Sequence, residues 1–250
     1  MGALERTLPD LHEDVLPILA EPALEPDLEM VHTRNHIGRV RSACEQALET
    51  GQIIKLDDDT VVSPGSWNAA LAAVGCGFAA VRDVLSGRQL GGFCPIRPPG
   101  HHATQDRAMG FCLFNNVALA ARRALANPSV SRVLIADWDV HHGNGTQAIF
   151  YDRSDVFFVS LHGDPKDAFP HFLGHADEKG SGEGVGYNCN YPMPPGTPYD
   201  VWTKSLDDSI SKIQNFSPDA LIVSLGVDTY ENDPISFFKL KSDDFFDVGR

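Results

Sequence analysis

Basic residues are scarce in this 250-residue chain, which carries 20 Lys and Arg against 34 Asp and Glu. The formal net charge of -14 at pH 7 disfavours a nucleic-acid-binding surface and favours cationic or neutral partners. The five cysteines form no CxxC pair, and their odd number predicts reduced thiols and a cytoplasmic setting. No apolar run reaches the ~20 residues of a membrane span, and the start MGALERTLPDLHED lacks a secretory signal's apolar stretch. We therefore expect no nucleic-acid partner and no membrane partner.

Apolar strand-like segments alternate with helical patterns along most of the chain. Helical spacing and end signals predict helices over about 35–49, 64–87, 115–127 and 199–216. Short runs rich in Val, Ile, Leu and Phe predict strands over 132–140, 155–163 and 219–228. Such alternation is typical of an α/β fold with a mainly parallel central sheet and helices on both faces. The segment 163–198 is rich in Gly and Pro, and we expect it to be a long functional loop.

Polar side chains lie at the ends of all three predicted strands, and the second of these strands ends in Ser160 and His162. The segment DWDVHHGNG places Asp137, Asp139 and His141 at alternate positions, so a continued strand would put them on one side. Two carboxylates beside an imidazole are unfavourable unless a cation neutralises them. Asp228, at the end of another predicted strand, could join Asp139 and His141, and three protein ligands with one open position describe a catalytic metal site. The alternative is a strand-end cluster that caps neighbouring helices.

The segment RPPGHHA, residues 97–103, places two adjacent histidines on a stiff loop. Histidine titrates near neutral pH and can act as a general base or a general acid. His101 and His102 could therefore both face a metal-activated water, with Asp137 and Asn144 as partners for their other ring nitrogens. The alternative is a pair of surface histidines without a catalytic role.

Several motifs together resemble the histone deacetylase and acetylpolyamine amidohydrolase superfamily in order and spacing: RPPGHHA, GFCLFNN, DWDVHHGNGTQ, SLHGDP and LGVDTYENDP. The resemblance covers about residues 30–250. The segments HGDPKDAFPHFLGHADEKGSGEG and DPISFFKL are most similar to the acetylpolyamine amidohydrolase branch. The resemblance implies an arginase-deacetylase fold and a zinc-dependent amide hydrolase that removes acetyl groups from acetylated polyamines or similar small amines. It also implies that residues 1–250 form a single deacetylase domain.

The resemblance also assigns roles to residues of this chain. It implies that Asp139, His141 and Asp228 are zinc ligands. His101 and His102 become the catalytic pair, oriented by Asp137 and Asn144, and the neutral amide beside His102 suits a general base. It further implies a structural potassium ion, held by Asp137, Asp139, His141, Ser160 and Leu161. Substrate contacts would come from Asp59 at the channel mouth and from the channel walls Gly110, Phe111 and Phe169. A second monovalent site near Phe150, Arg153 and Val156 is a weaker match.

One part of the family pattern has no counterpart in these 250 residues. The family holds the oxyanion with a tyrosine hydroxyl from a Gly-Gly-Tyr turn after the next strand, and such a donor is worth ~10²–10³ in rate. The five tyrosines here lie in other motifs (Tyr151, Tyr187, Tyr191, Tyr199 and Tyr230). The first strand expected near the N-terminus is also missing. We therefore expect a domain incomplete at the C-terminus and at the N-terminus, with open sheet edges.

Other functions remain open at this point. The substrate could be acetyl-lysine in proteins, or the chain could be a non-catalytic metal-binding fragment without the oxyanion tyrosine. An arginase-like manganese enzyme is disfavoured, because two bridged metals need more carboxylates around His141 than the sequence offers. Iron or cobalt could replace zinc, since two aspartates form a harder ligand set. The resemblance and the segment 163–198 favour a small amine substrate and a homodimer.

Overall fold

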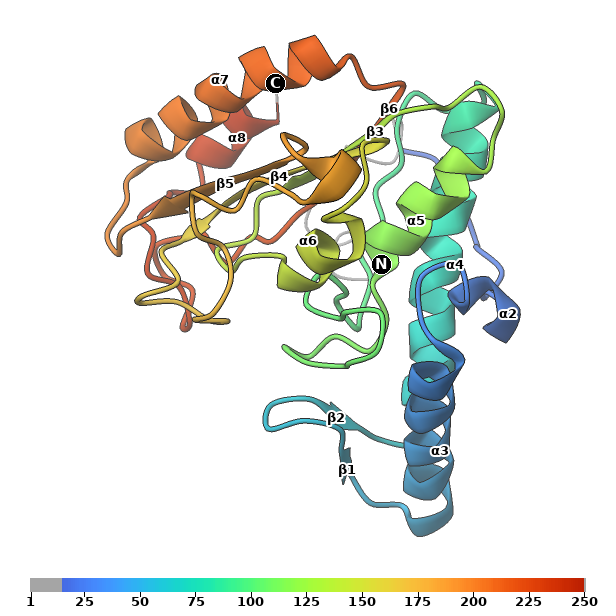
Figure 1. Cartoon of the computed structure of the whole chain (residues 1–250). Helices are drawn as coiled ribbons and strands as arrows, with labels where there is room; N and C mark the ends of the chain where they lie inside the picture. Colours follow the sequence, from blue (N-terminus) through green and yellow to red (C-terminus); the bar gives the residue numbers. More distant parts are fainter. Residues whose placement is uncertain (1–14, 250) are drawn as a thin grey trace.

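A central parallel sheet organises the computed structural model, which describes residues 15–249 (Figure 1). Its strand order is β5-β4-β3-β6, and every neighbouring pair is parallel. The strands are β3 (Val133–Asp137), β4 (Val156–Gly163), β5 (Asn188–Met193) and β6 (Ala220–Ser224). The predicted α/β class with a parallel sheet is confirmed.

Strand β5 is a correction to the sequence prediction, which treated residues 163–198 as one loop. Its sequence NCNYPM puts Asn188 and Asn190 at buried positions, so the apolar pattern of a strand is absent. Their amide groups donate hydrogen bonds to the Gln147 side chain, at 2.9 and 2.8 Å, which satisfies polar atoms that burial would otherwise penalise. The asparagines of this strand can therefore be buried because Gln147, on a helix outside the strand, accepts their hydrogen bonds.

Helices cover both faces of the sheet (Figure 1). On one face, α5 (Asn116–Leu125) contacts β3 and β6, and α4 (Ser66–Leu85) packs against α5. On the other face, α7 (Tyr199–Phe216) contacts β4 and β5. The short helix α6 (Asn144–Phe150) follows β3 and contacts β4. The predicted helix over 199–216 has the observed bounds, and the other predicted helices differ from the observed ones by one or two residues at each end.

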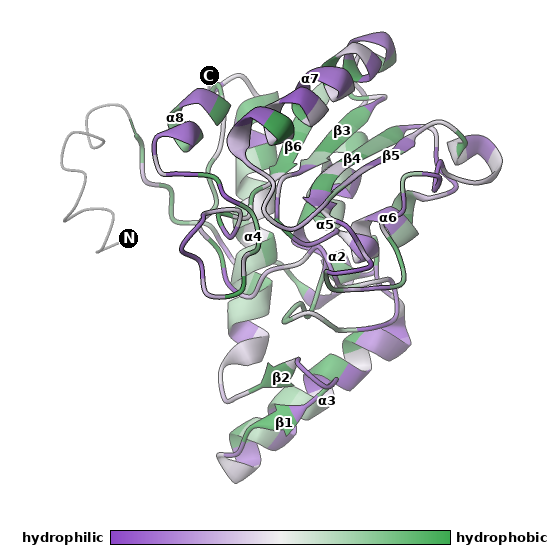
Figure 2. Ribbon diagram, turned by 90° about the vertical axis from the view of Figure 1, so that its left-hand side faces the viewer, coloured by the Kyte–Doolittle hydropathy of each residue, from purple (hydrophilic) through white to green (hydrophobic). Residues whose placement is uncertain are grey.

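The sheet separates two apolar cores. All residues of β3 and β4 are buried, and Figure 2 shows these two strands as predominantly hydrophobic ribbons. Because neighbouring residues of a strand point to opposite faces, Ile135 and Phe158 join the core under α4 and α5, whereas Leu134 and Phe157 join the core under α7. Strands with two covered faces therefore appear in the sequence as continuous apolar runs.

The N-terminal part adds helices α2 (Glu25–Leu28) and α3 (Arg34–Thr50) and the small antiparallel pair β1 (Ile54–Lys55) and β2 (Val61–Val62). The hydroxyl of Thr33 accepts a hydrogen bond from the His36 N–H and caps α3, which ends at Gly51 with φ +67°. A single 3-10 turn (Gly182–Gly184) and helix α8 (Asp244–Val248) complete the elements among the described residues.

The expectation that no segment is long and apolar enough for a membrane span does not hold for helix α4. Among the described residues, it is the one helix whose length and composition would allow it. A helix in the core of a folded domain meets the same criteria, and the buried residues of α4 include Ala70, Ala73 and Val74.

Strand β6 forms one edge of the four-stranded sheet and pairs with β3 alone within residues 15–249. Leu221 on this strand is 59% exposed. An apolar groove between α4, α5 and β6 is lined by residues such as Val81, Ala120 and Val223, and it contains none of the predicted site residues.

Candidate active site and metal centre

The chain segments that leave the carboxyl ends of β3 and β6 carry the predicted metal ligands. Asp139 and His141 lie in the turn between β3 and α6, and Asp228 lies in the loop after β6. Since β3 and β6 are parallel neighbours, these segments leave the sheet at the same end, the carboxyl end of its strands. Ligands commonly bind there in α/β folds. The Trp138 N–H donates to the Ser224 carbonyl at 2.9 Å and holds the start of the turn against β6.

Both predicted strands extended too far at their carboxyl ends. Strand β3 ends at Asp137 and β6 at Ser224, so strand alternation does not position Asp139, His141 or Asp228. The carboxylate of Asp137 accepts the Asp139 N–H at 3.3 Å, and that of Asp139 accepts the His141 N–H at 2.8 Å. Aspartate side chains that bond to the backbone two residues later favour turns over strands.

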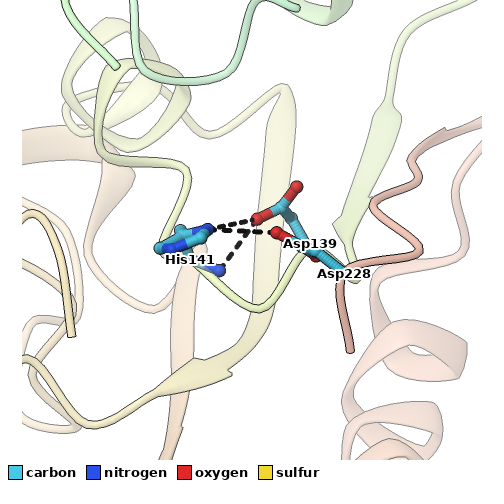
Figure 3. A group of neighbouring side chains, drawn as sticks. All are labelled: Asp139, His141 and Asp228. Atoms are coloured by element: carbon cyan, nitrogen blue, oxygen red, sulfur yellow. Dashed lines mark hydrogen bonds and ion pairs between the residues drawn. The ribbon is translucent and has the colours of Figure 1, made fainter. Parts of the chain in front are cut away.

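The turn brings Asp139, His141 and Asp228 together (Figure 3). Nδ1 of His141 lies 3.1 Å from Oδ1 of Asp139 and 3.1 Å from Oδ2 of Asp228. One ligand atom from each residue lies within 4.8 Å of the others, so the three could hold one metal ion. The second oxygen of Asp228 accepts the Val140 N–H at 3.0 Å, which fixes that carboxylate against the turn.

The two carboxylates of this cluster are stable side by side only with a positive charge between them. Burial disfavours the charged form of His141, but hydrogen bonds from its ring to Asp139 and Asp228 raise its pKa to about 10. Burial raises the pKa of Asp228. For Asp139, the neighbouring His101 and His141 outweigh burial and lower the pKa. Two partly buried carboxylates therefore need a cation between them, and a divalent ion can take the place of the His141 proton.

Gly226 makes the close approach of the two loops possible. A side chain at this position would collide with the Asp139 carboxylate. The LGVD segment predicted Asp228 as a ligand but gave no reason for its glycine. A glycine two residues before a candidate ligand was the available signal.

The two loop histidines lie beside this cluster and are buried. Their ring centroids are 4.0 Å apart. Nδ1 of His101 lies 3.0 Å from Oδ2 of Asp137, and Nδ1 of His102 lies 2.7 Å from Oδ1 of Asn144. Each histidine thus has the partner that the sequence analysis expected, and the surface-loop alternative does not describe them.

These partners give the two rings different proton preferences. Burial disfavours the imidazolium of His101, but Asp137 and Asp139 outweigh it and raise its pKa to about 9. The pKa of His102 falls well below its usual value because the ring is buried and lies against His101. The Asn144 amide nitrogen faces the Met109 sulfur at 3.5 Å, so its oxygen faces His102. A neutral His102 therefore carries its proton on Nδ1 and leaves Nε2 as a free base.

The start of α6 packs closely against the histidine loop. The Thr146 N–H donates to the His101 carbonyl at 3.1 Å. A side chain at Gly145 would collide with the Ala103 carbonyl, so only glycine permits this approach. The helix therefore fixes the backbone of the histidine pair as well as the ring of His102.

The four predicted channel residues lie on three segments, around Asp59, around Gly110 and Phe111, and around Phe169. Gly110 and Phe111 both have left-handed backbone conformations, with φ +57° and +64°. Their N–H groups donate to the side chains of Asp59 and Thr60, at 3.1 and 3.0 Å. A side chain at Gly110 would collide with the His102 ring, so this glycine lies directly against that ring.

Phe169 packs against His102 from the segment that follows β4. The two ring centroids are 4.9 Å apart and the planes meet at 87°. Phe237, which the sequence analysis missed, similarly meets His141 edge to face at 6.3 Å. The adjacent pair Phe237 and Phe238 in DPISFFKL carried no signal for this contact. Tyr230, the tyrosine closest in sequence to Asp228, has its hydroxyl bonded to Asn232 at 3.1 Å.

The residues expected at a potassium site also lie together in part. Asp137 and Ser160 are register partners on β3 and β4, and Leu161 follows on β4. Among the described residues, the carbonyl oxygens of Asp139 and His141 accept no hydrogen bond. For the weaker second site, the Phe150 carbonyl accepts the Arg153 N–H at 3.0 Å, and Val156 begins β4.

The parallel sheet, with two carboxylates and three histidines grouped beyond the carboxyl ends of its strands, indicates the class of protein. The sequence matches the histone deacetylase domain over residues 2–250, and the chain belongs to this family. The family is metal-dependent, in agreement with a cluster able to hold a metal ion.

Comparison with individual relatives shows which members of the family the chain is similar to. The chain is 52% identical over 192 residues to an acetylpolyamine amidohydrolase from Mycoplana ramosa, covering 77% of this chain and 56% of that protein. Its structure is similar to that of an acetylpolyamine aminohydrolase from Burkholderia pseudomallei, with TM-score 0.89, 32% identity and coverage of 98% and 78%. It is also similar to the HDA15 HD domain, with TM-score 0.91, 35% identity and coverage of 99% and 68%. The chain thus spans 56% of the length of the relative that it matches at 52% identity.

Proposed function

We propose that this chain carries a zinc-dependent amide hydrolase that removes acetyl groups from acetylated polyamines or similar small amines. The observation that carries the proposal is the Asp139, His141 and Asp228 cluster, which lies beside a buried histidine pair with two different partners. A zinc ion in this ligand set supplies Lewis-acid activation of the amide carbonyl and of the attacking water. Iron or cobalt could substitute, because two carboxylates form a harder ligand set.

The histidine pair supplies the proton transfers in this proposal. His102 has its Nδ1 proton held by Asn144, so its Nε2 lone pair can take the proton of the attacking water. A histidine then returns a proton to the departing amine. His101 favours the imidazolium form because Asp137 accepts from it, and His102 is protonated after the first transfer. Acetate and the free amine leave.

A small cationic substrate fits the surroundings of the site. The 52% identity to a protein named acetylpolyamine amidohydrolase supports this substrate class. Gly110, Phe111 and Phe169 would form the walls of a narrow channel. Asp59 is exposed, and one of its carboxylate oxygens accepts no hydrogen bond among the described residues, so it could pair with a substrate ammonium group.

The proposal includes a structural potassium ion at the Asp137, Asp139, His141, Ser160 and Leu161 positions. Support comes from the two turn carbonyls that accept no hydrogen bond within residues 15–249, and from the buried Ser160 hydroxyl on the neighbouring strand. Carbonyl, hydroxyl and carboxylate oxygens are the donors that hard cations prefer. A homodimer remains a prediction from the resemblance, and sedimentation of the purified chain would test it.

The experiment is a turnover comparison between acetylputrescine and an acetyl-lysine peptide, with the metal content of the same sample measured. We expect a single zinc per chain and faster hydrolysis of acetylputrescine. Faster hydrolysis of the peptide would favour the protein deacetylase alternative, and bound zinc without hydrolysis would favour the metal-binding alternative. Two bound manganese ions would instead support the arginase-like reading.

The base assignment has its own test in the variant His102→Ala. Loss of a general base should lower turnover by ~10²-fold or more, with the zinc content unchanged. A variant with wild-type turnover would contradict the role of His102.

A further inference from the structure

His162 is a buried histidine outside the catalytic pair, and both of its ring nitrogens have partners. It lies on β4, and its exposed fraction is 0%. Its Nδ1 lies 2.7 Å from the Ser160 hydroxyl oxygen, and its Nε2 lies 2.9 Å from the Gly174 carbonyl oxygen. The ring therefore bridges its own strand and the segment that follows it.

The two contacts determine where the ring carries its proton. A carbonyl oxygen only accepts, so Nε2 of His162 must be the donor to Gly174. The ring is fully buried and its two hydrogen-bond partners are an uncharged hydroxyl and a carbonyl, which suits a neutral imidazole with one donor. Its Nδ1 is then an acceptor, and the Ser160 hydroxyl must donate to it.

This arrangement commits the only hydrogen that the Ser160 hydroxyl can donate. The oxygen keeps lone pairs that can accept, and the residue is fully buried. Ser160 is the register partner of Asp137, next to the turn whose Asp139 and His141 carbonyls lack hydrogen bonds among the described residues. A hydroxyl with its hydrogen held elsewhere can serve only as an oxygen ligand there.

The other end of the bridge is held from several sides. Gly174 has φ +109°, and a Cβ at this position would lie 2.8 Å from Nε2 of His162 and 2.9 Å from Cγ of His142. The Gly174 N–H donates to the Glu178 carboxylate at 2.9 Å. The segment between β4 and Gly174 carries Phe169, which packs edge to face on the His102 ring. His162 thus connects the Ser160 oxygen with the segment that lines the catalytic base.

We propose that His162 is a positioning residue that directs the Ser160 oxygen toward a monovalent cation and anchors the segment carrying Phe169. The inference rests on the proposed potassium site and adds a link between that ion and the wall of the substrate channel. Partners that orient a metal ligand through its second hydrogen bond commonly change metal affinity by ~10–100-fold when they are lost. One ring thus holds both the oxygen of a cation ligand and the segment 164–174, through its two different nitrogens.

Two variants separate the two functions of the ring. In His162→Asn, the shorter side chain can place its oxygen near the Nδ1 position and still accept from Ser160, but it cannot reach Gly174. In His162→Gln, the longer side chain can place its amide near the Nε2 position and still donate to Gly174, but no acceptor faces Ser160. His171→Gln is the matched control, because His171 is an exposed histidine of the same segment.

The first readout is the midpoint of thermal unfolding as KCl replaces tetramethylammonium chloride at constant ionic strength. We expect a saturable rise for the wild type, a ~10-fold weaker apparent potassium affinity for His162→Gln, and no response for Ser160→Ala. His162→Asn and the control should keep affinities near the wild-type value. The second readout is amide exchange of residues 164–174, which should become faster in His162→Asn alone.

Several outcomes would overturn the inference. Wild-type potassium affinity in a folded His162→Gln protein would exclude the orienting role, and unchanged exchange in His162→Asn would exclude the anchoring role. If a variant fails to fold, nitrogen-15 NMR of labelled histidines in the wild type decides, because a proton on Nδ1 of His162 contradicts the assignment. A wild type without any potassium response would remove the cation site and this inference together. Zinc content and acetylputrescine hydrolysis would still test the proposed function separately.

Discussion

At the residue scale, the buried histidine His32 makes the stability of the fold depend on pH. Its Nε2 accepts the Asn115 N–H at 2.9 Å, so the ring is required in its neutral form. Burial, with the neighbouring His36 as a second cause, lowers the pKa from 6.5 to about 3. Between these two values the unfolded chain binds a proton at this residue and the folded chain does not. Stability contributed by His32 is therefore present above pH 6.5 and is lost as the pH falls toward 3.

The variant His32→Gln tests this dependence, because a glutamine oxygen can accept the same N–H and does not titrate. One proton taken up by the unfolded state alone costs about 1.4 kcal/mol of unfolding free energy per pH unit. We expect the loss of stability between pH 6 and pH 4.5 to be smaller in the variant by about 1–2 kcal/mol. Urea unfolding at several pH values measures it, with His171→Gln as the exposed control. Parallel pH curves for the variant and the wild type would show that His32 does not contribute.

At the element scale, the turn from Met109 to Cys112 brings backbone directly against His102, the proposed base. Gly110 has φ +57° and lies against the His102 ring, whereas Gly182 has φ +53° and open space where a side chain would lie. Both glycines carry the same conformational cost for an alanine, about 1 kcal/mol. Gly182→Ala should show that cost alone. Gly110→Ala should lose additional stability and should lower kcat by ~10-fold or more, because a displaced ring misplaces the base.

Urea unfolding and acetylputrescine turnover of the two variants provide the comparison. Equal effects on turnover would mean that the contact between Gly110 and His102 does not position the base. This prediction depends on a proximity that the sequence does not show, since GFCLFNN indicates a glycine turn without indicating which side chain it meets.

The other elements also divide into those that a local sequence pattern predicts and those that depend on contacts between distant segments. Strands β3 and β4 were predictable because both faces are buried and their residues are continuously apolar. Strand β5 was not, because its buried asparagines depend on Gln147 of α6 for their partners. The carboxyl ends of β3 and β6 were misplaced because aspartate side chains bond to the turn backbone, a competition that periodicity does not register. Phe237 contacts His141 from a distant segment and had no local pattern in the sequence.

At the scale of the whole molecule, the metal cluster joins two segments that are far apart in the sequence. Asp139 and His141 follow β3, and Asp228 follows β6, so an ion held by all three would fasten neighbouring strand ends together. Without the ion, the His141 ring must supply the positive charge between two carboxylates. A metal that binds only the folded chain stabilises it by mass action, by about 2.7 kcal/mol when the free metal is 100 times its dissociation constant.

Removal of the metal should therefore lower the midpoint of thermal unfolding. For a domain of this length, that free energy corresponds to a shift of roughly 5–10 °C. We expect treatment with a chelator to lower the midpoint by about this amount, and stoichiometric zinc to restore it. In Asp228→Asn, one carboxylate ligand is replaced by a neutral amide of similar size, so the response to zinc should largely disappear while the protein still folds. A zinc response in Asp228→Asn equal to that of the wild type would mean that the ion binds elsewhere and that the loop after β6 does not hold it.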